Sequence, residues 1–131
     1  MAQIAKSGTP SLCSLLPNGA DVLAGLIAGE DLAALDACYI KSDGLVWKST
    51  GTAANAAAKV HGYAPKAAKA GAAVTLHKNI RAEYGSGLIP GTTIYLSATA
   101  GTLSDVATIG GTTPIGFVVT TTRIFLDVSR Y

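Results

Sequence analysis

Charged residues are scarce in this sequence of 131 residues. Asp, Glu, Lys and Arg make up 14% of it, against about a quarter of a typical soluble domain. Apolar residues make up 49%. A chain with so few charges and so many apolar side chains is expected to be poorly soluble alone or to lie against a partner. Its length predicts one domain with a core of its own.

Long hydrophobic runs are also missing. A membrane-spanning helix needs roughly 18 or more apolar residues, and the longest candidate here, Val22 to Ile27, ends before the acidic pair Glu30 and Asp31. The N-terminal residues include a lysine and two prolines but no continuous apolar stretch, so they do not resemble a signal peptide. We therefore expect no membrane partner, and synthesis in the cytoplasm.

Cysteine and histidine are too few and too widely spaced for a recognisable metal motif. None of Cys13, Cys38, His61 and His77 stands at the short spacing of a zinc site. The two cysteines could pair, but free thiols that pack as small apolar side chains are favoured in a chain without an export signal. No metal and no cofactor are expected.

Catalytic motifs are missing as well. Gly110-Gly111-Thr112 lacks the lysine with which a phosphate-binding loop holds the β- and γ-phosphates. Around Ser86, Tyr84 stands where a nucleophile elbow requires glycine. A serine, a histidine and an aspartate for a hydrolytic triad can be chosen from this sequence, but most protein sequences contain such a set, so it does not indicate catalysis. We expect no enzymatic activity and no catalytic residue.

Positive charge is concentrated in the middle of the chain. Between Asp43 and Glu83 there is no acidic residue, and the basic residues there are Lys48, Lys59, Lys66, Lys69, Lys78 and Arg81. They predict either a solvated face or a surface for an acidic partner. Nucleic acid is not the expected partner, because stacking aromatics are not interleaved with these residues and the formal net charge is only +2.

A pattern of short apolar runs and turns occurs twice. In the first half it is Gly25-Leu26-Ile27, Tyr39-Ile40 and Val60-His61-Gly62-Tyr63-Ala64, and in the second half Gly87-Leu88-Ile89, Tyr95-Leu96 and Ile115-Gly116-Phe117-Val118. A unit of short strands built twice indicates that each half buries the apolar face of the other. The predicted fold is all-β: a small β-barrel or β-sandwich of two loosely repeated halves, with an extended N-terminal arm.

Strand signals begin at Val22. Residues 36–47 predict a hairpin, since Asp43-Gly44 between β-rich runs supplies the positive φ that such a turn requires. Further strands are expected at Val60–Ala64, Ala73–His77, Thr92–Leu96, Ile115–Thr120 and Arg123–Val128. The alanine- and lysine-rich stretches 53–59 and 66–70 are cut short by glycine and proline, so they predict one short helix at most.

Alternation along these strands predicts the core. The side chains expected to point inward are Ile40, Val46, Val60, Val74, Leu76, Ile94, Leu96, Ile115, Val118, Ile124 and Leu126. Two glycines inside the expected strands, Gly62 and Gly116, predict bends or bulges where the sheet curls.

Residues 1–20 predict an arm that is separate from the β-domain of residues 21–131. Glycine, proline and Asn18-Gly19 interrupt the arm so often that no long regular element fits. Its apolar side chains, Ile4, Leu12, Leu15 and Leu16, cannot form a core of their own. They predict either that the arm binds the surface of a partner through these side chains or that it is a disordered tail.

Two stretches of the sequence resemble the capsid decoration (cement) proteins of tailed phages. The first runs from Ala28 to Ile40 and continues from Asp43 to Lys48; the second runs from Gly91 to Leu103 and continues from Pro114 to Val118. The resemblance implies a non-enzymatic structural protein of the virion. It would bind the outside of an icosahedral bacteriophage head, contact the major capsid protein and stabilise the capsid, after synthesis in the host cytoplasm.

Capsid contacts are expected from the arm and from the basic interval: Ile4, Leu12, Leu15, Leu16, Lys59, Lys66 and Lys69. The excess of apolar residues predicts a homo-oligomer, with a trimer as the expected form. The alternative function is a receptor- or glycan-binding β-module of a phage fibre or tail. Its sugar-stacking platforms would be Trp47, Tyr63, Tyr84 and Tyr95, although a place in the core or at strand ends is the more ordinary role for these aromatics.

Overall fold

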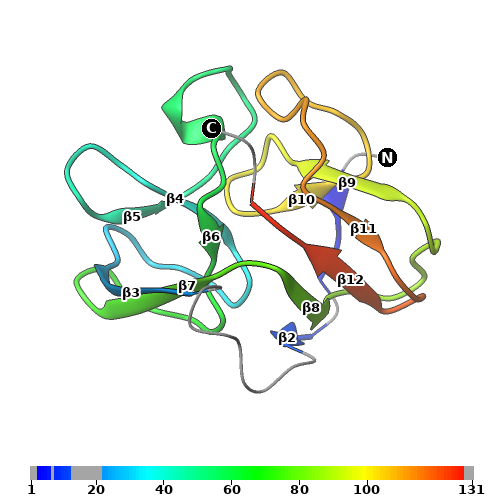
Figure 1. Ribbon diagram of the computed structural model, residues 1–131, viewed down its shortest axis with the longest axis horizontal. Coiled ribbons are helices and arrows are strands. Elements are labelled where there is room, and N and C mark those ends of the chain that lie inside the picture. Colours follow the sequence, from blue (N-terminus) through cyan, green and yellow to red (C-terminus); the bar gives the residue numbers. More distant parts are fainter. Residues whose placement is uncertain (1–2, 7, 13–21, 129–131) are drawn as a thin grey trace.

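The computed structural model describes residues 3–6, 8–12 and 22–128 and shows an all-β protein, which confirms the predicted fold class (Figure 1). The strands form two antiparallel sheets with open edges, so the sandwich of two halves is the form that the protein takes. Within the described residues the one helical element is the short 3-10 helix η2 (Ala56–Ala58). It lies in the first of the two alanine-rich stretches.

The first half of the chain forms a five-stranded sheet in the order β3-β7-β6-β4-β5. Its strands are β3 (Val22–Ile27), β4 (Ala37–Ile40), β5 (Val46–Lys48), β6 (Gly62–Tyr63) and β7 (Ala73–His77). The predicted hairpin is confirmed: β4 pairs with β5, and Gly44 in the connecting turn has a φ of 84°.

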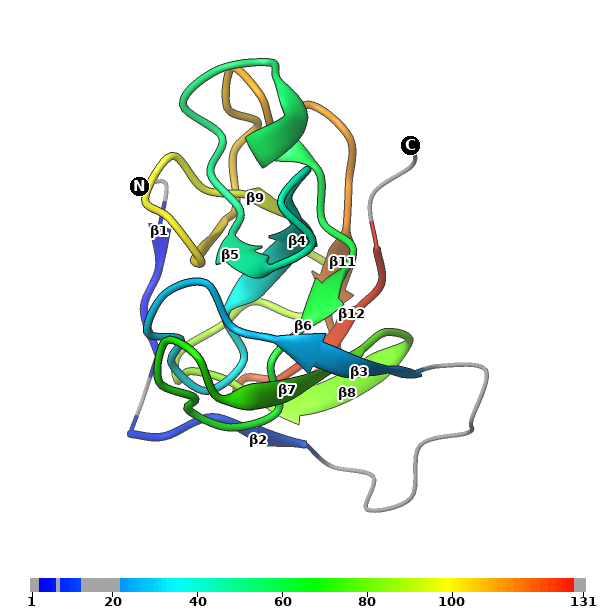
Figure 2. The same cartoon turned by 90° about the vertical axis from the view of Figure 1, so that its left-hand side faces the viewer.

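The second half forms a seven-stranded sheet in the order β1-β10-β9-β11-β12-β8-β2 (Figure 2). Its strands are β8 (Ile80–Glu83), β9 (Thr93–Leu96), β10 (Leu103–Ser104), β11 (Gly116–Val118) and β12 (Arg123–Leu126). The two outermost strands, β1 (Gln3–Ile4) and β2 (Ser11–Leu12), come from the N-terminal segment.

The two halves repeat the same strand order. The inner part of the larger sheet, β10-β9-β11-β12-β8, repeats β5-β4-β6-β7-β3 strand for strand. The register repeats too, because Gly62 lies opposite Cys38 as Gly116 lies opposite Ile94. The chain therefore forms one five-stranded unit twice, and Tyr39-Ile40 and Tyr95-Leu96 of the sequence repeat lie on equivalent strands. The predicted match of Gly25-Leu26-Ile27 with Gly87-Leu88-Ile89 is wrong, because the first lies within β3 and the second beyond the end of β8.

Gly62 and Gly116 serve close strand packing rather than the predicted bends or bulges. A Cβ atom at Gly62 would lie 2.7 Å from the Cβ atom of Leu76, and one at Gly116 would collide with the carbonyl oxygen of Phe125. The pairing of β11 with β12 runs through Gly116 without a shift. A register shift occurs instead in β3, between Leu23 and Leu26.

Of the predicted core residues, all are buried except Ile40, which is half-buried. They divide into two clusters. The larger one lies on the inner face of the second unit and includes four residues from the first: Leu35, Ala37, Val60 and Tyr63. The smaller one is formed by the first half alone, around Cys38, Val46, Val74 and Leu76. The halves therefore share one core, and the first half has a second core of its own.

The N-terminal segment is not separate from the β-domain, and the predicted boundary at residue 20 is wrong for the parts that the structure describes. Strand β1 pairs with β10, and β2 pairs with β8. Ile4 is 3% exposed in the larger core, so the expectation that Ile4 contacts a capsid is also wrong. The larger core of the same chain supplies the surface that this side chain needs, and the edge of β10 pairs with its backbone. Leu15 and Leu16 lie outside the described residues.

Candidate interaction surface

One row of side chains crosses the outer face of the seven-stranded sheet. Phe117 on β11 lies opposite Phe125 on β12, which lies opposite Arg81 on β8; on the other side Phe117 lies opposite Thr93 on β9. Their chain neighbours Ile94, Val118, Ile124, Ile80 and Ala82 are buried in the larger core. Alternation along each strand therefore turns this row outward.

The two phenylalanines form an exposed aromatic pair. Their ring centroids lie 5.2 Å apart with an angle of 30° between the rings, an offset geometry that stabilises such pairs by about 0.5–1.5 kcal/mol beyond the area they bury. Phe117 is nevertheless 48% exposed, and Phe125 is half-buried. An aromatic pair in this position offers a firm apolar contact to a partner.

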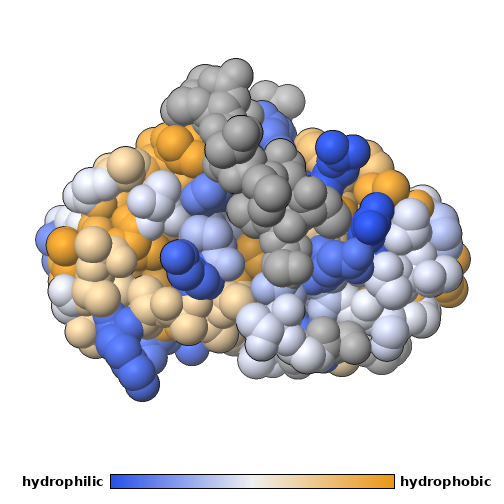
Figure 3. Space-filling model, turned by 90° about the horizontal axis from the view of Figure 1, so that it is seen from below, coloured by the Kyte–Doolittle hydropathy of each residue, from blue (hydrophilic) through white to orange (hydrophobic). Residues whose placement is uncertain are grey.

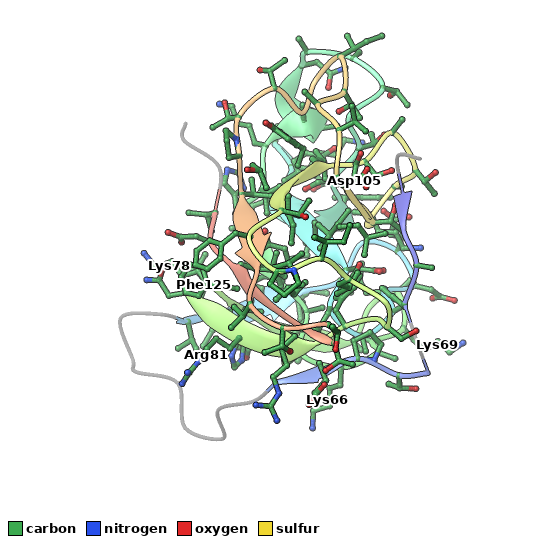
Figure 4. All side chains as sticks on the ribbon, turned by 90° about the vertical axis from the view of Figure 1, so that its right-hand side faces the viewer. Lys66, Lys69, Lys78, Arg81, Asp105 and Phe125 are labelled. Atoms are coloured by element: carbon green, nitrogen blue, oxygen red, sulfur yellow. The ribbon has the colours of Figure 1, made fainter. Side chains whose placement is uncertain are left out.

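A groove of about 610 Å³ runs beside this pair. Its lining includes Lys78, Asn79, Pro114, Phe117, Phe125 and Asp127. Figure 4 shows Lys78, Phe125 and Arg81 on the same side of the molecule. The carboxylate of Asp127 accepts a hydrogen bond from the N–H group of Val128 at 2.8 Å, so it is held in place at the rim.

Positive charge flanks the aromatic pair. On the same face the Nε atom of Arg123 lies 2.9 Å from a carboxylate oxygen of Glu83, and hydrogen bonding to Arg123 lowers the pKa of Glu83. Among the described residues no carboxylate forms an ion pair with Lys78 or Arg81. The groove thus combines apolar rings with two cations that are available to an acidic partner.

The basic interval does not form a single surface. Lys59 caps the C-terminal end of η2, at the top of Figure 1, whereas β8, which carries Arg81, lies near the bottom. Lys66 and Lys69 lie in the connection between β6 and β7 and are exposed. Lys69 also forms an exposed ion pair with Asp31 at 3.6 Å. The three predicted lysine contacts are therefore accessible, but Lys59 lines a different pocket from the groove beside Phe117 and Phe125.

The aromatics proposed as sugar platforms are mostly unavailable. Tyr63 and Tyr84 are 0% and 1% exposed, which confirms the more ordinary place in the core for these two and excludes them as sugar platforms. Trp47 is half-buried; its Nε1 atom donates to Asp43 at 3.2 Å, and the ammonium group of Lys41 lies 4.7 Å from the ring. Tyr95 is half-buried.

Phe117 and Phe125 were missed as site residues, although the sequence contained a signal for them. Ile124 and Leu126 were predicted to point inward, and in a strand the residue between two inward side chains points outward. An outward Phe125 followed from that pattern. Its pairing with Phe117 did not, because strand register is set by the tertiary structure.

The cysteine and histidine side chains offer no reactive or metal-binding centre in the described part of the chain, where no three potential ligands converge. Cys38 is fully buried, and burial together with the nearby Asp36 raises the pKa of its thiol to about 12. His61 accepts a hydrogen bond from the N–H group of Ile40 at 2.8 Å through Nδ1, and burial lowers its pKa. Cys13 lies outside the described residues.

Comparison with protein-family models gives no match for this chain, and comparison with curated proteins gives none either. Among the described residues, no helix has the length and apolar character needed to cross a membrane.

Proposed function

We propose that this protein is a capsid decoration (cement) protein, a non-enzymatic structural protein that binds the outer surface of a tailed-phage head and contacts the major capsid protein. The observation that carries the proposal is the exposed Phe117–Phe125 pair with Lys78 and Arg81 beside it, on the outer face of a regular sheet. The resemblance of residues 28–48 and 91–118 to this class of protein supports it.

The surface of Phe117, Phe125, Lys78 and Arg81 has the composition of a protein-binding patch. Aromatic residues and arginine are enriched at the centres of interfaces, where a few of them provide most of the binding free energy. Because two cations lie beside the rings, the complementary patch on the coat is apolar with an acidic rim. A sheet face changes little on binding, so little ordering entropy opposes the contact.

Decoration stabilises a capsid through mass action. A protein that binds only the assembled lattice lowers the free energy of that lattice and opposes its disassembly. A small domain of two repeated β-units, in a chain of which only 14% of the residues are charged, suits this role better than it suits catalysis. A homo-oligomer, in the trimeric form that the composition predicts, would place several such surfaces on neighbouring coat subunits. Because these surfaces are held together in one oligomer, its overall affinity for the capsid would exceed the affinity of a single surface.

Titration of particles that lack the protein with the purified chain tests this proposal. Phe117→Ala and Arg81→Glu should each lower the affinity for particles by about 10-fold or more, since truncation of a central contact costs at least about 1–2 kcal/mol. Ile89→Ala is the control for Phe117→Ala, because Ile89 is 73% exposed and lies outside the row. Unchanged circular dichroism would show that the variants are folded.

A parallel substitution, Lys66→Glu, separates the two candidate surfaces. Occupancy that falls with Lys66→Glu but not with Phe117→Ala or Arg81→Glu would move the contact to the connection between β6 and β7. Wild-type protein that fails to bind particles at all would refute the decoration role.

A glycan-binding module of a fibre or tail is the second candidate function. The observation that favours it is the same groove, in which the exposed ring of Phe117 lies near the polar side chains of Asn79 and Asp127. Localisation by immunogold labelling discriminates between the two: many copies over the head support decoration, and a few copies at the tail support glycan binding.

A further inference from the structure

One acidic side chain differs from all the others that the structure describes. The carboxylate of Asp105 forms no hydrogen bond and no ion pair with another described residue, and its Oδ1 atom is buried. Every other described carboxylate has a partner; these residues are Glu30, Asp31, Asp36, Asp43, Glu83 and Asp127. Buried polar atoms in native proteins are nearly always hydrogen-bonded, so an exception calls for a ligand, an ion or a water that completes it.

Asp105 lies at the end of the inner face of the seven-stranded sheet. It follows β10 directly, and Leu103, two residues earlier, is buried in the larger core. Alternation therefore turns Asp105 to the side of the core. The bend after β10 is held by Ser104, whose hydroxyl group donates to the carbonyl oxygen of Val106 at 2.7 Å and accepts from its N–H group at 3.0 Å. The backbone that carries the unpaired carboxylate is thus fixed.

A recess of about 470 Å³ opens beside this carboxylate. One wall comes from Ile4 of β1, another from Leu88 in the connection between β8 and β9, and a third from Val118 of β11. Ile4 and Val118 are each 3% exposed, and the half-buried Leu88 packs against the larger core. Sites for small molecules have volumes of about 300–1,000 Å³ and combine apolar walls with a few polar groups. The recess has both properties.

The polar groups of the recess are mostly hydrogen-bond acceptors. Besides Asp105 they include the hydroxyl groups of Ser86 and Thr92, neither of which bonds to another described residue. Lys6 also lines the recess, but its Nζ atom lies 2.8 Å from the carboxylate of Asp36, so its charge is compensated there. The uncompensated charge of the described lining is therefore negative. An ammonium group, with three donors and no acceptor, matches one carboxylate and two hydroxyl groups.

We propose that this recess binds a small primary alkylammonium ion, with its ammonium group on Asp105 and its alkyl chain along the apolar walls. A guanidinium group pairs best with both oxygens of a carboxylate, whereas the burial of Oδ1 leaves a single oxygen of Asp105 for a cation. Quaternary ammonium ions are recognised by aromatic faces, and the described lining contains no aromatic side chain. Ca²⁺ takes about six to eight oxygen ligands, and no three potential metal ligands converge in the described part of the chain.

The recess is separate from the candidate interaction surface. Figure 4 shows Asp105 apart from Lys78 and Phe125, which belong to that surface. Apolar side chains also gather over the first unit, on the left-hand part of the lower face in Figure 3, but the described carboxylates of that unit are all engaged. Among the described residues, apolar walls and an unpaired carboxylate therefore coincide at the recess alone. The inference goes beyond the proposed capsid contact, because it concerns a different part of the molecule.

Titration of the isotope-labelled full chain with n-hexylamine, followed by nuclear magnetic resonance, tests the proposal. The backbone amide signals of Ser86, Thr92 and Asp105 should shift together and reach saturation. The neutral probe n-hexanol has the same chain length but cannot form an ion pair with the carboxylate. It should bind at least about 10-fold more weakly.

Substitution of Asp105 separates the charge from the apolar walls. Asp105→Asn should lower the affinity for n-hexylamine by about 10-fold or more and leave the affinity for n-hexanol unchanged. The matched control is Asp31→Asn, which removes a carboxylate that is 66% exposed and lies outside the recess. It should bind both probes as the wild type does. Thr92→Val is the second variant if Asp105→Asn does not fold, and it should weaken n-hexylamine binding by about 3-fold or more.

Four results would overturn the proposal. They are the absence of saturable shifts, equal affinity for n-hexylamine and n-hexanol, an equal loss of affinity in Asp105→Asn and Asp31→Asn, and tighter binding of a lysine capped at both ends than of n-hexylamine. The last result would assign the recess to a lysine side chain of a partner protein instead of a small amine. None of these measurements uses a phage particle, so their failure leaves the proposed function standing.

Discussion

At the scale of single residues, two buried tyrosines illustrate how differently one side-chain type can contribute. The hydroxyl group of Tyr63 donates to the carbonyl oxygen of Asp127 at 2.7 Å and thereby connects β6 to the end of β12. The hydroxyl group of Tyr84 is buried and has no hydrogen-bond partner among the described residues. Burial raises the pKa of both phenols, so both are neutral under ordinary conditions.

Substitution of each tyrosine by phenylalanine should therefore act in opposite directions. Tyr63→Phe leaves the Asp127 carbonyl without its donor and should lower the free energy of unfolding by about 1–3 kcal/mol. Tyr84→Phe removes a buried unpaired hydroxyl and should leave stability unchanged or raise it by about 1 kcal/mol. Urea denaturation of the two variants checks the pair. A loss of stability in Tyr84→Phe equal to that in Tyr63→Phe would contradict the assignment.

The repeated glycines give a second prediction at this scale. Gly62→Ala and Gly116→Ala should each destabilise the fold by about 1–3 kcal/mol, because the neighbouring strand leaves no room for a Cβ atom. Thermal unfolding measures both. Similar losses at the two positions would support their equivalence in the repeat, and a neutral result at both would contradict the close packing.

At the scale of elements, the sequence was most informative where local chemistry decides the structure. Asp43-Gly44 predicted its hairpin because the turn needs a positive φ, and Ala73–His77 was predicted with its observed bounds. Strand β8 was missed, since Arg81 and Glu83 give it a mixed composition and its pairing with β12 lies far along the chain. The N-terminal segment was misplaced for a similar reason: only the tertiary structure provides the edges that β1 and β2 cover.

Lys6 anchors the N-terminal segment to the first unit, and its removal tests that role. Its ammonium group lies 2.8 Å from the carboxylate of Asp36, a side chain that is only 4% exposed, and donates to the carbonyl oxygen of Ala34 at 2.9 Å. Lys6→Met leaves a buried carboxylate without its cation and should destabilise the protein by about 3–5 kcal/mol.

The control is Lys69→Met, which removes the exposed Lys69–Asp31 pair and should leave the free energy of unfolding nearly unchanged. Chemical denaturation measures both variants. Equal stability of Lys6→Met and wild type would show that the N-terminal segment is dispensable for the fold, as an independent arm would be.

At the scale of the whole molecule, the repeat followed from the sequence but the distribution of charge did not. Gly62 and Gly116 occupy equivalent positions at which the neighbouring strand leaves no room for a Cβ atom, so glycine recurs there in both halves. The lysines occupy surface positions, and their nearness in sequence says little about nearness in space: Lys59 ends η2, near the top of Figure 1, whereas Arg81 belongs to β8, near the bottom. A surface assembled from distant strands, such as Phe117, Phe125 and Arg81, requires the register of the sheet.

The arrangement of the two cores predicts how the molecule unfolds. The larger core takes Leu35, Ala37, Val60 and Tyr63 from the first half, so the second unit cannot keep its core when the first unit unfolds. We therefore expect a single cooperative transition. Leu96→Ala in the larger core and Leu76→Ala in the smaller should each lower the free energy of unfolding by about 2–5 kcal/mol, and they should shift the same transition.

Urea unfolding followed by both far-ultraviolet circular dichroism and Trp47 fluorescence measures this, because Trp47 lies in the first half whereas the strands of both halves contribute to the dichroism. Coincident curves for the wild type and for both variants are the expected result. If Leu76→Ala instead splits the unfolding into two steps, with Trp47 fluorescence changing first, the first unit unfolds on its own. The larger core would then hold the second unit together without the four residues that the first half contributes.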